Sequence, residues 1–401
     1  MPASRLKLLF VVEGYTDIRF VAGLSEIADL TLAVPQVQYR ESGLGRRIEQ
    51  AGIKVQVAEL PGRRFAYQQR CFRYLWNHIR EFDVVLSQEM LRGSFNACMV
   101  GALKGAPVVL YTCLPAIDYF RCRRERKQLG WVKALAGEWL IRALMTINGR
   151  LAARCVAMGP YLCQIARRYC PRTENGLYYG VDTDFFRPAD TEERRQLRRK
   201  LDLPVDKFLI FLSSRISHEK DPETVLRAAS IARKRGLDAV VLNLGGGYKD
   251  FLELGRRLEL PGVEEWILGR PAAHPMTEVA DYFRTADVMA LASLSEGLGI
   301  SNLEALACGT PVVCTAVGGM ALELKGLARL TPRRDAEAMA REFLWIAANT
   351  EAARAHALQG REYVVREWNR RRAFSDLLIT LQQVARSKVA PESRPSAAAL
   401  S

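Results

Sequence analysis

The chain has 401 residues, of which 49% are hydrophobic and 25% are charged, and its formal net charge is +14. This length predicts two domains, and this composition excludes a largely disordered chain. Nine scattered cysteines without a CxxC pair favour a reducing compartment over a disulfide-stapled fold. No signal-peptide pattern opens the sequence, and Pro311 interrupts the one charge-free window of membrane length, so we expect a cytoplasmic protein without a membrane-spanning helix.

Short apolar runs alternate with helix-length segments through the first 180 residues. Strands are expected over 7–12, 29–35, 53–60, 83–87, 107–112 and 154–159. Helices are expected near 17–28, 43–51, 65–81, 94–104, 124–150 and 160–169. Alternation of this kind predicts a parallel sheet that is covered by helices on both faces.

A second series of the same kind follows a polar segment at 180–201, which we interpret as a linker and the first helix of a second domain. Strands are expected over 207–214, 239–247, 264–269, 287–293, 310–317 and 328–331. Helices are expected near 221–236, 248–258, 276–285, 300–308, 335–347 and 357–386. The fold class is therefore α/β with two doubly wound units. We expect domains at 1–180 and 181–364, a helix over about 365–387 that could cross back to the first domain, and a disordered tail over 388–401.

The segment EGLGISNLEALACGTPVV, which begins at Glu296, follows the expected strand 287–293. Ligands of open parallel sheets bind beyond the carboxyl ends of the strands, so Glu296 lies where a ligand would bind. Glycines after Glu296 permit a sharp turn, and the first amides of the following helix can hold a phosphate. Ser301 and Glu304 have the spacing of a capping box, which gives Glu304 a purely structural alternative.

Two cations flank the loop that follows the first strand of the second series. In FLSSRISHEKDPETVLRAA (211–229), Arg215 and Lys220 are five residues apart. Two cations at this edge of a sheet suit a diphosphate, since arginine is a fork of donors and lysine a point charge. The alternative is a pair of solvated loop charges.

Taken together, these segments resemble the nucleotide-sugar domain of retaining glycosyltransferases with the GT-B architecture, of the family 4 or group 1 type. The resemblance covers roughly 175–375 through GVDTDFFRP, SSRISHEKDPETVLRAA, LNLGGG and the Glu-x7-Glu segment, and it covers 1–170 only by architecture. It implies two Rossmann-like domains that face a central cleft. It also implies a nucleotide-diphosphate sugar as donor substrate and no other cofactor.

The resemblance further implies a role for each matching residue. Glu296 would contact hydroxyls of the donor sugar, and Glu304 would bind the nucleotide ribose. Arg215 and Lys220 would hold the diphosphate and stabilise the leaving group. The backbone amides that would share this charge are those of Gly297, Leu298, Gly299 and Ile300. Similar enzymes retain the anomeric configuration, with the donor phosphate taking the proton of the acceptor.

The first domain departs from the family pattern in two places. The turn after the first expected strand is VEGYTD, in which Gly14 is the one equivalent of a glycine-rich loop. The stretch VVLYTCLPAIDYF lacks the histidine that many members carry near the end of the fifth strand. There Asp118 or Tyr119 could contact the acceptor, or Asp118 could cap the next helix. These departures leave open a catalytically degenerate donor-binding or scaffold protein, and an epimerase or phosphorylase of the same architecture is a further alternative.

One acidic motif points to metal-dependent transfer, but its position argues against that reading. Asp182-Thr183-Asp184 spells the DxD motif of metal-dependent transferases, yet it lies in the linker-like segment. We therefore predict a transferase that is independent of metal.

Nearly all the excess positive charge lies in the first half of the chain, with about +13 over residues 1–200 and about +1 over 201–401. The basic clusters are Arg63 and Arg64; Arg121, Arg123, Arg124, Arg126 and Lys127; and the run from Arg194 to Lys200. We expect an anionic or membrane-borne acceptor, such as a lipid-linked sugar or a growing polysaccharide, and no nucleic acid. The second cluster, with Trp131, Leu135 and Trp139 after it, could rest on an anionic bilayer. The alternatives are solvated arginines and aromatic side chains that pack in the core.

Overall fold

Seven short strands form the first sheet in the order β3-β2-β1-β4-β5-β6-β7, and every neighbouring pair is parallel. The strands are β1 (Lys7–Val11), β2 (Asp29–Pro35), β3 (Gln56–Leu60), β4 (Val84–Gln88), β5 (Val108–Thr112), β6 (Arg154–Met158) and β7 (Thr173–Gly176). The computed structural model describes residues 5–62, 65–127 and 130–387. The polar strand β7 was not expected, because TENG has no apolar pattern; it lies at the edge of the sheet.

The helices around this sheet follow the expected alternation, except that a short helix over 36–41 was not expected and the region near 124–150 differs in form. They are α1 (Ile18–Ile27), α2 (Gln36–Glu41), α3 (Leu44–Gln50), α4 (Phe65–His78), the short η1 (Ile79–Glu81), α5 (Arg92–Lys104), α6 (Ala116–Lys127), α7 (Trp131–Leu151) and α8 (Gly159–Arg167). The single helix expected over 124–150 is confirmed for the length of α7 but is wrong at its start, because residues 124–127 belong to α6. Two helices form a hairpin there: α6 ends at Lys127, α7 begins at Trp131, and Gly137 lets Phe120 of α6 lie against α7.

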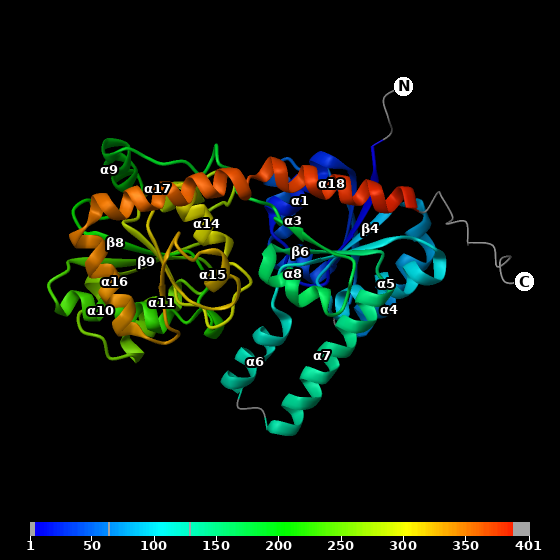
Figure 1. The fold of residues 1–401 in the computed structure, drawn as a ribbon, viewed down its shortest axis with the longest axis horizontal. Helices are drawn as coiled ribbons and strands as arrows, with labels where there is room; N and C mark the ends of the chain where they lie inside the picture. The colour runs from blue at the N-terminus through cyan, green and yellow to red at the C-terminus, as the bar shows by residue number, and fades with distance from the viewer. Residues whose placement is uncertain (1–4, 63–64, 128–129, 388–401) are drawn as a thin grey trace, which may run out of the picture.

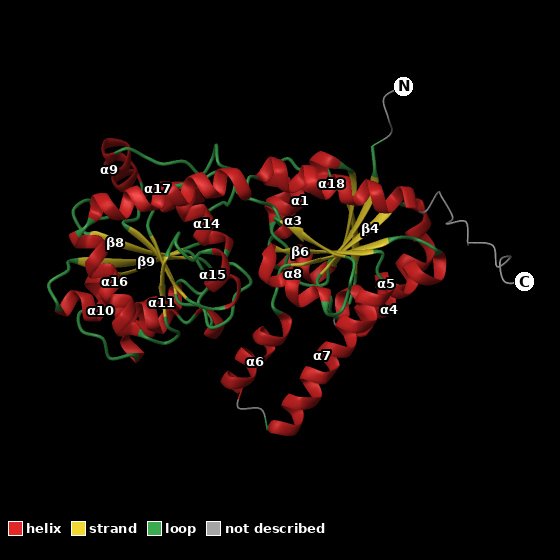
Figure 2. Cartoon of the chain, in the orientation of Figure 1, coloured by secondary structure: helices red, strands yellow, loops and turns green. Residues whose placement is uncertain are grey.

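Six parallel strands form the second sheet, in the order β10-β9-β8-β11-β12-β13. They are β8 (Phe208–Leu212), β9 (Ala239–Leu244), β10 (Ile267–Arg270), β11 (Val288–Leu291), β12 (Val312–Thr315) and β13 (Arg329–Thr331). The helices are α9 (Thr191–Lys200), η2 (His218–Lys220), α10 (Pro222–Lys234), α11 (Lys249–Arg257), α12 (Val263–Trp266), α13 (Val279–Thr285), α14 (Ile300–Ala307), α15 (Gly318–Glu323) and α16 (Ala336–Ala348). Central strands such as β5 and β9 are buried throughout, because helices cover both faces of each sheet (Figure 2). The predicted fold class is confirmed.

The last two helices connect the two sheets, which lie side by side in Figure 1. Helix α17 (Thr350–Glu367) packs on α14, and α18 (Arg370–Ser387) returns to the first sheet and contacts α1, β4 and β7. The sequence suggested one helical stretch over 357–386, and the break at Asn369 separates two. Asn369 pairs with Val181, so the two chain crossings lie next to each other. The expected tail at 388–401 lies outside the described residues, and the division at residues 180 and 364 stays a prediction.

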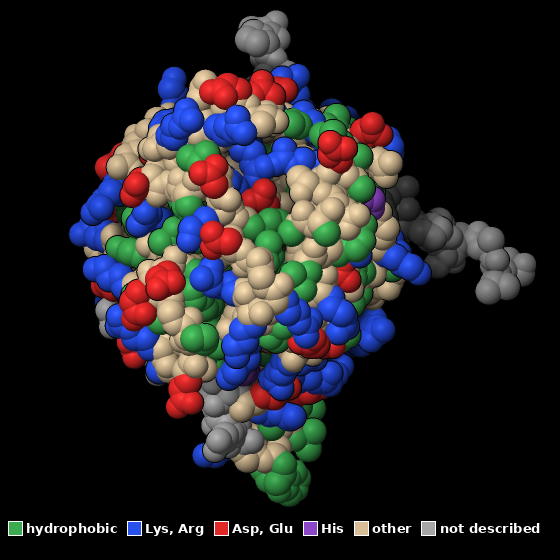
Figure 3. All heavy atoms as spheres, turned by 90° about the vertical axis from the view of Figure 1, so that its left-hand side faces the viewer, with side chains coloured by type: hydrophobic (Ala, Val, Ile, Leu, Met, Phe, Trp, Pro, Cys, Tyr) green, Lys and Arg blue, Asp and Glu red, His purple; other side chains and the backbone are tan. Residues whose placement is uncertain are grey.

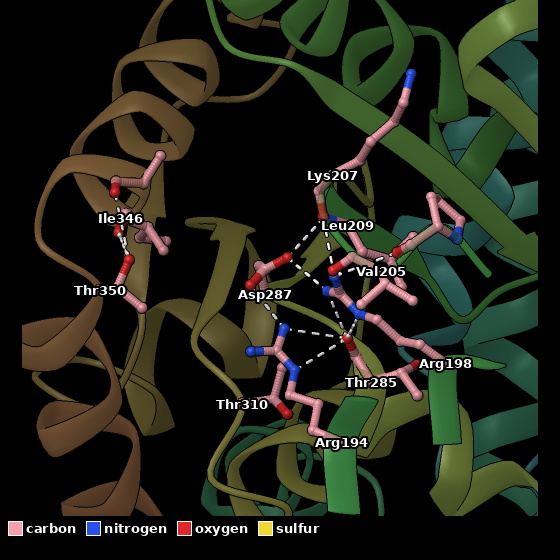
Figure 4. A network of polar contacts seen from close by, with 12 residues as sticks. Arg194, Arg198, Val205, Lys207, Leu209, Thr285, Asp287, Thr310, Ile346 and Thr350 are labelled. Carbon is pink, nitrogen blue, oxygen red and sulfur yellow. Dashed lines mark hydrogen bonds and ion pairs between the residues drawn. The ribbon is translucent and has the colours of Figure 1, made fainter. Parts of the chain in front are cut away.

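The basic run at 194–200 has a structural role that the sequence did not reveal (Figure 4). Only 5% of the Arg198 side chain is exposed, and both Arg194 and Arg198 pair with Asp287, at 2.6 and 2.7 Å. Arg198 also donates to backbone carbonyl groups, among them that of Thr285. Both arginines therefore hold α9 against the second sheet. Arg63 and Arg64, of another expected cluster, lie outside the described residues.

Candidate active site

The turn that begins at Glu296 lies beyond the carboxyl end of β11, as expected. Helix α14 begins at Ile300 after Gly299, whose φ of +71° is in the left-handed region that favours glycine. A second backbone segment presses on this turn: a Cβ at Gly318 would lie 2.0 Å from the carbonyl oxygen of Glu296, and one at Gly319 would lie 1.7 Å from that of Gly297. The first amides of α14 are therefore held in place by close backbone packing.

Lys220 and Glu296 are brought together by two different loops. Lys220 ends η2, and its Nζ forms an ion pair with Oε2 of Glu296. The hydroxyl of Ser293 donates to the same oxygen at 3.1 Å. The backbone amide of Leu294 donates to the carbonyl of Glu219 at 2.8 Å, which ties the η2 loop to the loop after β11. Lys220, which is predicted to bind the diphosphate, and Glu296, which is predicted to bind the sugar, thus lie in one site.

Arg215 points toward the first domain. Its Nη2 donates to Oε1 of Glu219 at 2.8 Å and to the hydroxyl of Tyr119 at 3.1 Å. Tyr119 belongs to α6, and its hydroxyl donates to the same Glu219 oxygen at 2.9 Å. Burial opposes the ionisation of Glu219, but hydrogen bonds and the Arg215 charge lower its pKa. The carboxylate is therefore ionised and holds Arg215 at the cleft between the two domains.

The structure contradicts the capping-box interpretation of Glu304. Because the residue before α14 is Gly299, Ser301 already lies within the helix and cannot cap it. Glu304 instead forms an ion pair with Arg19, which lies at the start of α1 in the first domain. Burial raises the pKa of Glu304, although the Arg19 charge acts against this. Glu304, which is predicted to bind the ribose, is thus a buried carboxylate that pairs with the guanidinium of Arg19 across the cleft.

Arg19 is the functional candidate that the sequence did not reveal. Its guanidinium donates to both oxygens of Asp17 at 2.9 Å and to the hydroxyl of Tyr179 at 2.7 Å. Burial acts against its charge, but the Asp17 and Glu304 carboxylates prevail and raise the pKa of Arg19. An Asp-x-Arg after a strand is too common to have marked this residue, and only the packing of the two domains places it beside Glu304.

The structure places the residues at which the first domain departs from the family pattern. Gly14 lies in the exposed loop between β1 and α1, with open space where a Cβ would be, so its predicted role in substrate binding stays a prediction. Cys113 follows β5, where the family histidine was sought, and its carbonyl oxygen lies 3.0 Å from the place a Cβ would take on Gly297. Its thiol donates to Glu89 at 3.1 Å. Asp118 lies in the first turn of α6 and accepts from the Tyr161 hydroxyl at 3.0 Å.

The Asp182-Thr183-Asp184 motif forms a local turn. The carboxylate of Asp182 accepts from the backbone amides of Asp184 and Phe185, and Asp184 pairs with Arg371 on α18. Within residues 5–62, 65–127 and 130–387, no three His, Cys, Asp or Glu side chains form a group that could hold a metal ion. In the same part of the chain, no helix is long and apolar enough to cross a membrane.

A buried carboxylate at the domain contact was also missed. Burial raises the pKa of Glu323, the last residue of α15, to about 7. A Cβ at Gly159, the first residue of α8, would lie 2.6 Å from its Oε1, so the carboxylate lies against the start of that helix. Helix α15 is the segment that presses on the Glu296 turn, and Glu323 is therefore close to the site without being part of it.

Comparison with known proteins finds a family match in the second half of the chain. Residues 193–363 match the family described as Glycosyl transferases group 1. The D-inositol 3-phosphate glycosyltransferase of Arthrobacter sp. (strain FB24) is 37% identical over 145 residues, which are 35% of this chain and 33% of that protein. D-inositol 3-phosphate glycosyltransferase 1 of Catenulispora acidiphila is 29% identical over 263 residues, 60% of this chain and 57% of that protein. The match thus spans about a third of the first relative and just over half of the second.

Solved structures resemble the whole described chain. HepE from Anabaena, in complex with UDP-glucose, has a TM-score of 0.71 at 15% identity and covers 95% of this chain and 99% of its own. Sucrose-phosphate synthase from Thermosynechococcus elongatus has a TM-score of 0.72 at 16% identity, with coverage of 95% and 99%. These likenesses show the GT-B fold.

Proposed function

Because residues 193–363 match the group 1 glycosyl transferases, we propose that the chain transfers a sugar from a nucleotide-diphosphate sugar to an acceptor, with retention of anomeric configuration. The observation that carries this proposal is the cluster at the carboxyl edge of the second sheet. There Lys220, Glu296 and the start of α14 lie together, and Arg215 faces the first domain from the same loop as Lys220.

The cluster has the chemistry that a departing diphosphate requires. Lys220 uses one of its three N–H donors on Glu296, which leaves two for phosphate oxygens. Arg215 would offer its remaining N–H groups, and the first amides of α14 add the positive end of a helix. Fixed positive charge that is aimed at a leaving group is commonly the largest contribution to catalysis. This charge supports a transferase that works without a bound metal.

Retention would follow if the acceptor approached from the face that the diphosphate leaves. The donor phosphate would then take the acceptor proton, and the protein would mainly hold the two substrates in line. Glu296 would accept hydrogen bonds from sugar hydroxyls and so fix the ring. Glu304 would accept from a ribose hydroxyl through Oε2, because Arg19 contacts Oε1.

The acceptor in this proposal is anionic or membrane-borne, such as a lipid-linked or polysaccharide intermediate, and the reaction is cytoplasmic. The support is the excess positive charge of the first half of the chain. A cavity of about 230 Å³ between α6, α7 and α8 has Arg121, Arg142 and Arg168 in its lining. It lies in the domain that binds acceptors in enzymes of this architecture.

Ligand screening and turnover together test the function. Nucleoside diphosphates and their sugar conjugates are expected to raise the melting temperature, more strongly at higher concentration. Lys220→Ala and Arg215→Ala should each lower turnover by about 100-fold or more, since each removes a charge from the leaving group. Lys234→Ala, which removes an exposed lysine at the end of α10, is the matched control and should leave turnover unchanged.

Each outcome assigns or removes a function. No shift with any nucleoside diphosphate would overturn donor binding. Binding without turnover, in the presence of candidate acceptors, would assign the degenerate donor-binding alternative. An isomerised donor or a sugar phosphate product would assign an epimerase or a phosphorylase.

A further inference from the structure

The outer face of α7 is apolar and exposed. Trp131, Leu135 and Trp139 have exposed fractions of 78%, 66% and 69%, and Val132 and Leu140 are also exposed. The interpretation that these aromatic side chains pack in the core is therefore wrong. Residues four apart lie on one side of a helix, so the first three form a continuous stripe. We call these five residues the apolar face of the hairpin.

The hairpin presents this face away from the protein. The opposite side of α7 packs on α6, where Ala134 is buried and Phe120 fills the space beside Gly137. Helices α6 and α7 project from the first domain in Figure 1, and hydrophobic side chains gather at the end of the projection in Figure 3. The apolar face is therefore on a convex protrusion, unlike the groove that would receive a helix of a partner protein.

The hairpin that carries the apolar face is positively charged. Residues 116–151 contain eight Lys and Arg against three Asp and Glu, a net charge of +5. Arg121 and Arg142 share Glu138, whereas the cations Arg124 and Lys133 form no ion pair within the described residues. Figure 3 shows Lys and Arg side chains above the apolar end of the projection. A positively charged hairpin with exposed tryptophans complements an anionic lipid surface, in which the rings enter the interface and the cations meet the headgroups.

We propose that the α6–α7 hairpin docks on an anionic lipid bilayer through its apolar face, with the basic side chains against the headgroups. The docking stands independently of the proposed transferase function. Its use rests on that function: α6 carries Tyr119 to Arg215 and Glu219, and Glu125 of α6 pairs with Arg334 of the second domain at 3.0 Å. A hairpin on the bilayer would therefore hold the donor cleft next to a lipid-linked acceptor.

Vesicle sedimentation at low salt tests the docking with the full chain. The wild-type protein should sediment with vesicles of phosphatidylglycerol and phosphatidylcholine, and less with phosphatidylcholine alone or at high salt. The variant Trp131→Ser with Leu135→Ser and Trp139→Ser should lower the partition coefficient by about 100-fold or more, because three large apolar side chains leave the interface. Trp345→Ser, at a partly exposed tryptophan on α16, is the matched control and should sediment like the wild type.

Three results would overturn the proposal. One is wild-type protein that stays in the supernatant with anionic vesicles at low salt, and another is a triple variant that sediments as the wild type does. The third is a dimer that dissociates in the triple variant without vesicle binding in either, which would assign the face to a second copy. The unfolding midpoint and the nucleoside diphosphate thermal shift of the variants, measured without vesicles, separate a failure of docking from misfolding or a failure of the proposed function.

Discussion

Two arginine-rich segments look alike in the sequence and differ in the folded chain. In α9 the run RRQLRRK places Arg194 and Arg198 on one face, where both pair with Asp287 and only 12% and 5% of their side chains are exposed. In α6 the run RCRRERK leaves Arg121 and Arg123 exposed. The difference arises from the acidic partner: Asp287 precedes a central strand and is itself fixed by the Leu209 amide, whereas Glu138 lies on the neighbouring helix of an exposed hairpin.

The spacing of the charges and the burial of their acidic partner therefore matter more than the number of charges. A buried arginine is tolerated when carbonyl oxygens and a carboxylate satisfy its donors, and the chain then uses it as a structural anchor. An arginine on a projecting hairpin has no such partner at depth and remains available to an external anion.

Removing one arginine of the Asp287 cluster should have the largest effect on the free energy of unfolding. Arg198→Ala leaves Asp287 and several carbonyl groups without a buried donor, so the free energy of unfolding should fall by about 3–5 kcal/mol. Arg199→Ala, one residue along and exposed, should change it by less than about 0.5 kcal/mol. Urea unfolding followed by circular dichroism measures both. If both substitutions lowered the free energy of unfolding equally, the structural role assigned to Arg198 would be contradicted.

Removing charge from the hairpin should change membrane binding and leave stability alone. Arg123→Gln with Arg124→Gln should weaken binding to anionic vesicles by about fivefold for each charge, since a cation near such a surface contributes about 1 kcal/mol. The unfolding midpoint should stay within error of the wild type. Arg195→Gln with Arg199→Gln in α9 is the matched control for vesicle binding. A midpoint that moves as far as that of Arg198→Ala would mean that α6 is also an anchor.

Removing the ion pairs of Glu138 should have only a small effect on the free energy of unfolding. Hydrogen bonds from Arg121 and Arg142 lower the pKa of Glu138 from 4.5 to about 2. A carboxylate whose pKa is lowered by folding stabilises the folded state at any pH above its ordinary pKa. This stabilisation is lost as the pH falls from the ordinary pKa toward the lowered pKa. Glu138→Gln should therefore cost less than about 1 kcal/mol, because exposed pairs are screened by solvent. Urea unfolding should give a smaller difference at pH 3 than at pH 7, and an equal difference at the two pH values would contradict the lowered pKa.

Much of the fold was predictable because it depends on local pattern. Buried parallel strands are continuous apolar runs, and those from β1 to β6 and from β8 to β13 were found within a few residues of their bounds. Strand β7 and the division into α6 and α7 were missed, since a polar edge strand and two adjoining helices without a clear apolar periodicity have weak signals. The segments of the Glu296 site were found because glycine turns and cations stand beside strand ends.

The contacts across the cleft could not be predicted from the sequence. Arg19 meets Glu304 over 285 positions of chain, and Tyr119 meets Glu219 over 100. Such pairs depend on how the two domains are placed, which no periodicity encodes. The capping-box interpretation of Glu304 failed for the same reason: a local partner was assumed where a distant one prevails.

The return of α18 to the first sheet has a practical consequence for exchanging parts between related enzymes. Phe374 fills the space beside Gly23, and Arg370 pairs with Glu26 at 2.7 Å, so this last helix completes a domain that begins at the other end of the polypeptide. A chimera joined once, near residue 180, would combine one parent's acceptor half with the other parent's closing helix. Two junctions are needed, one near Val181 and one near Asn369, and these two residues already lie side by side.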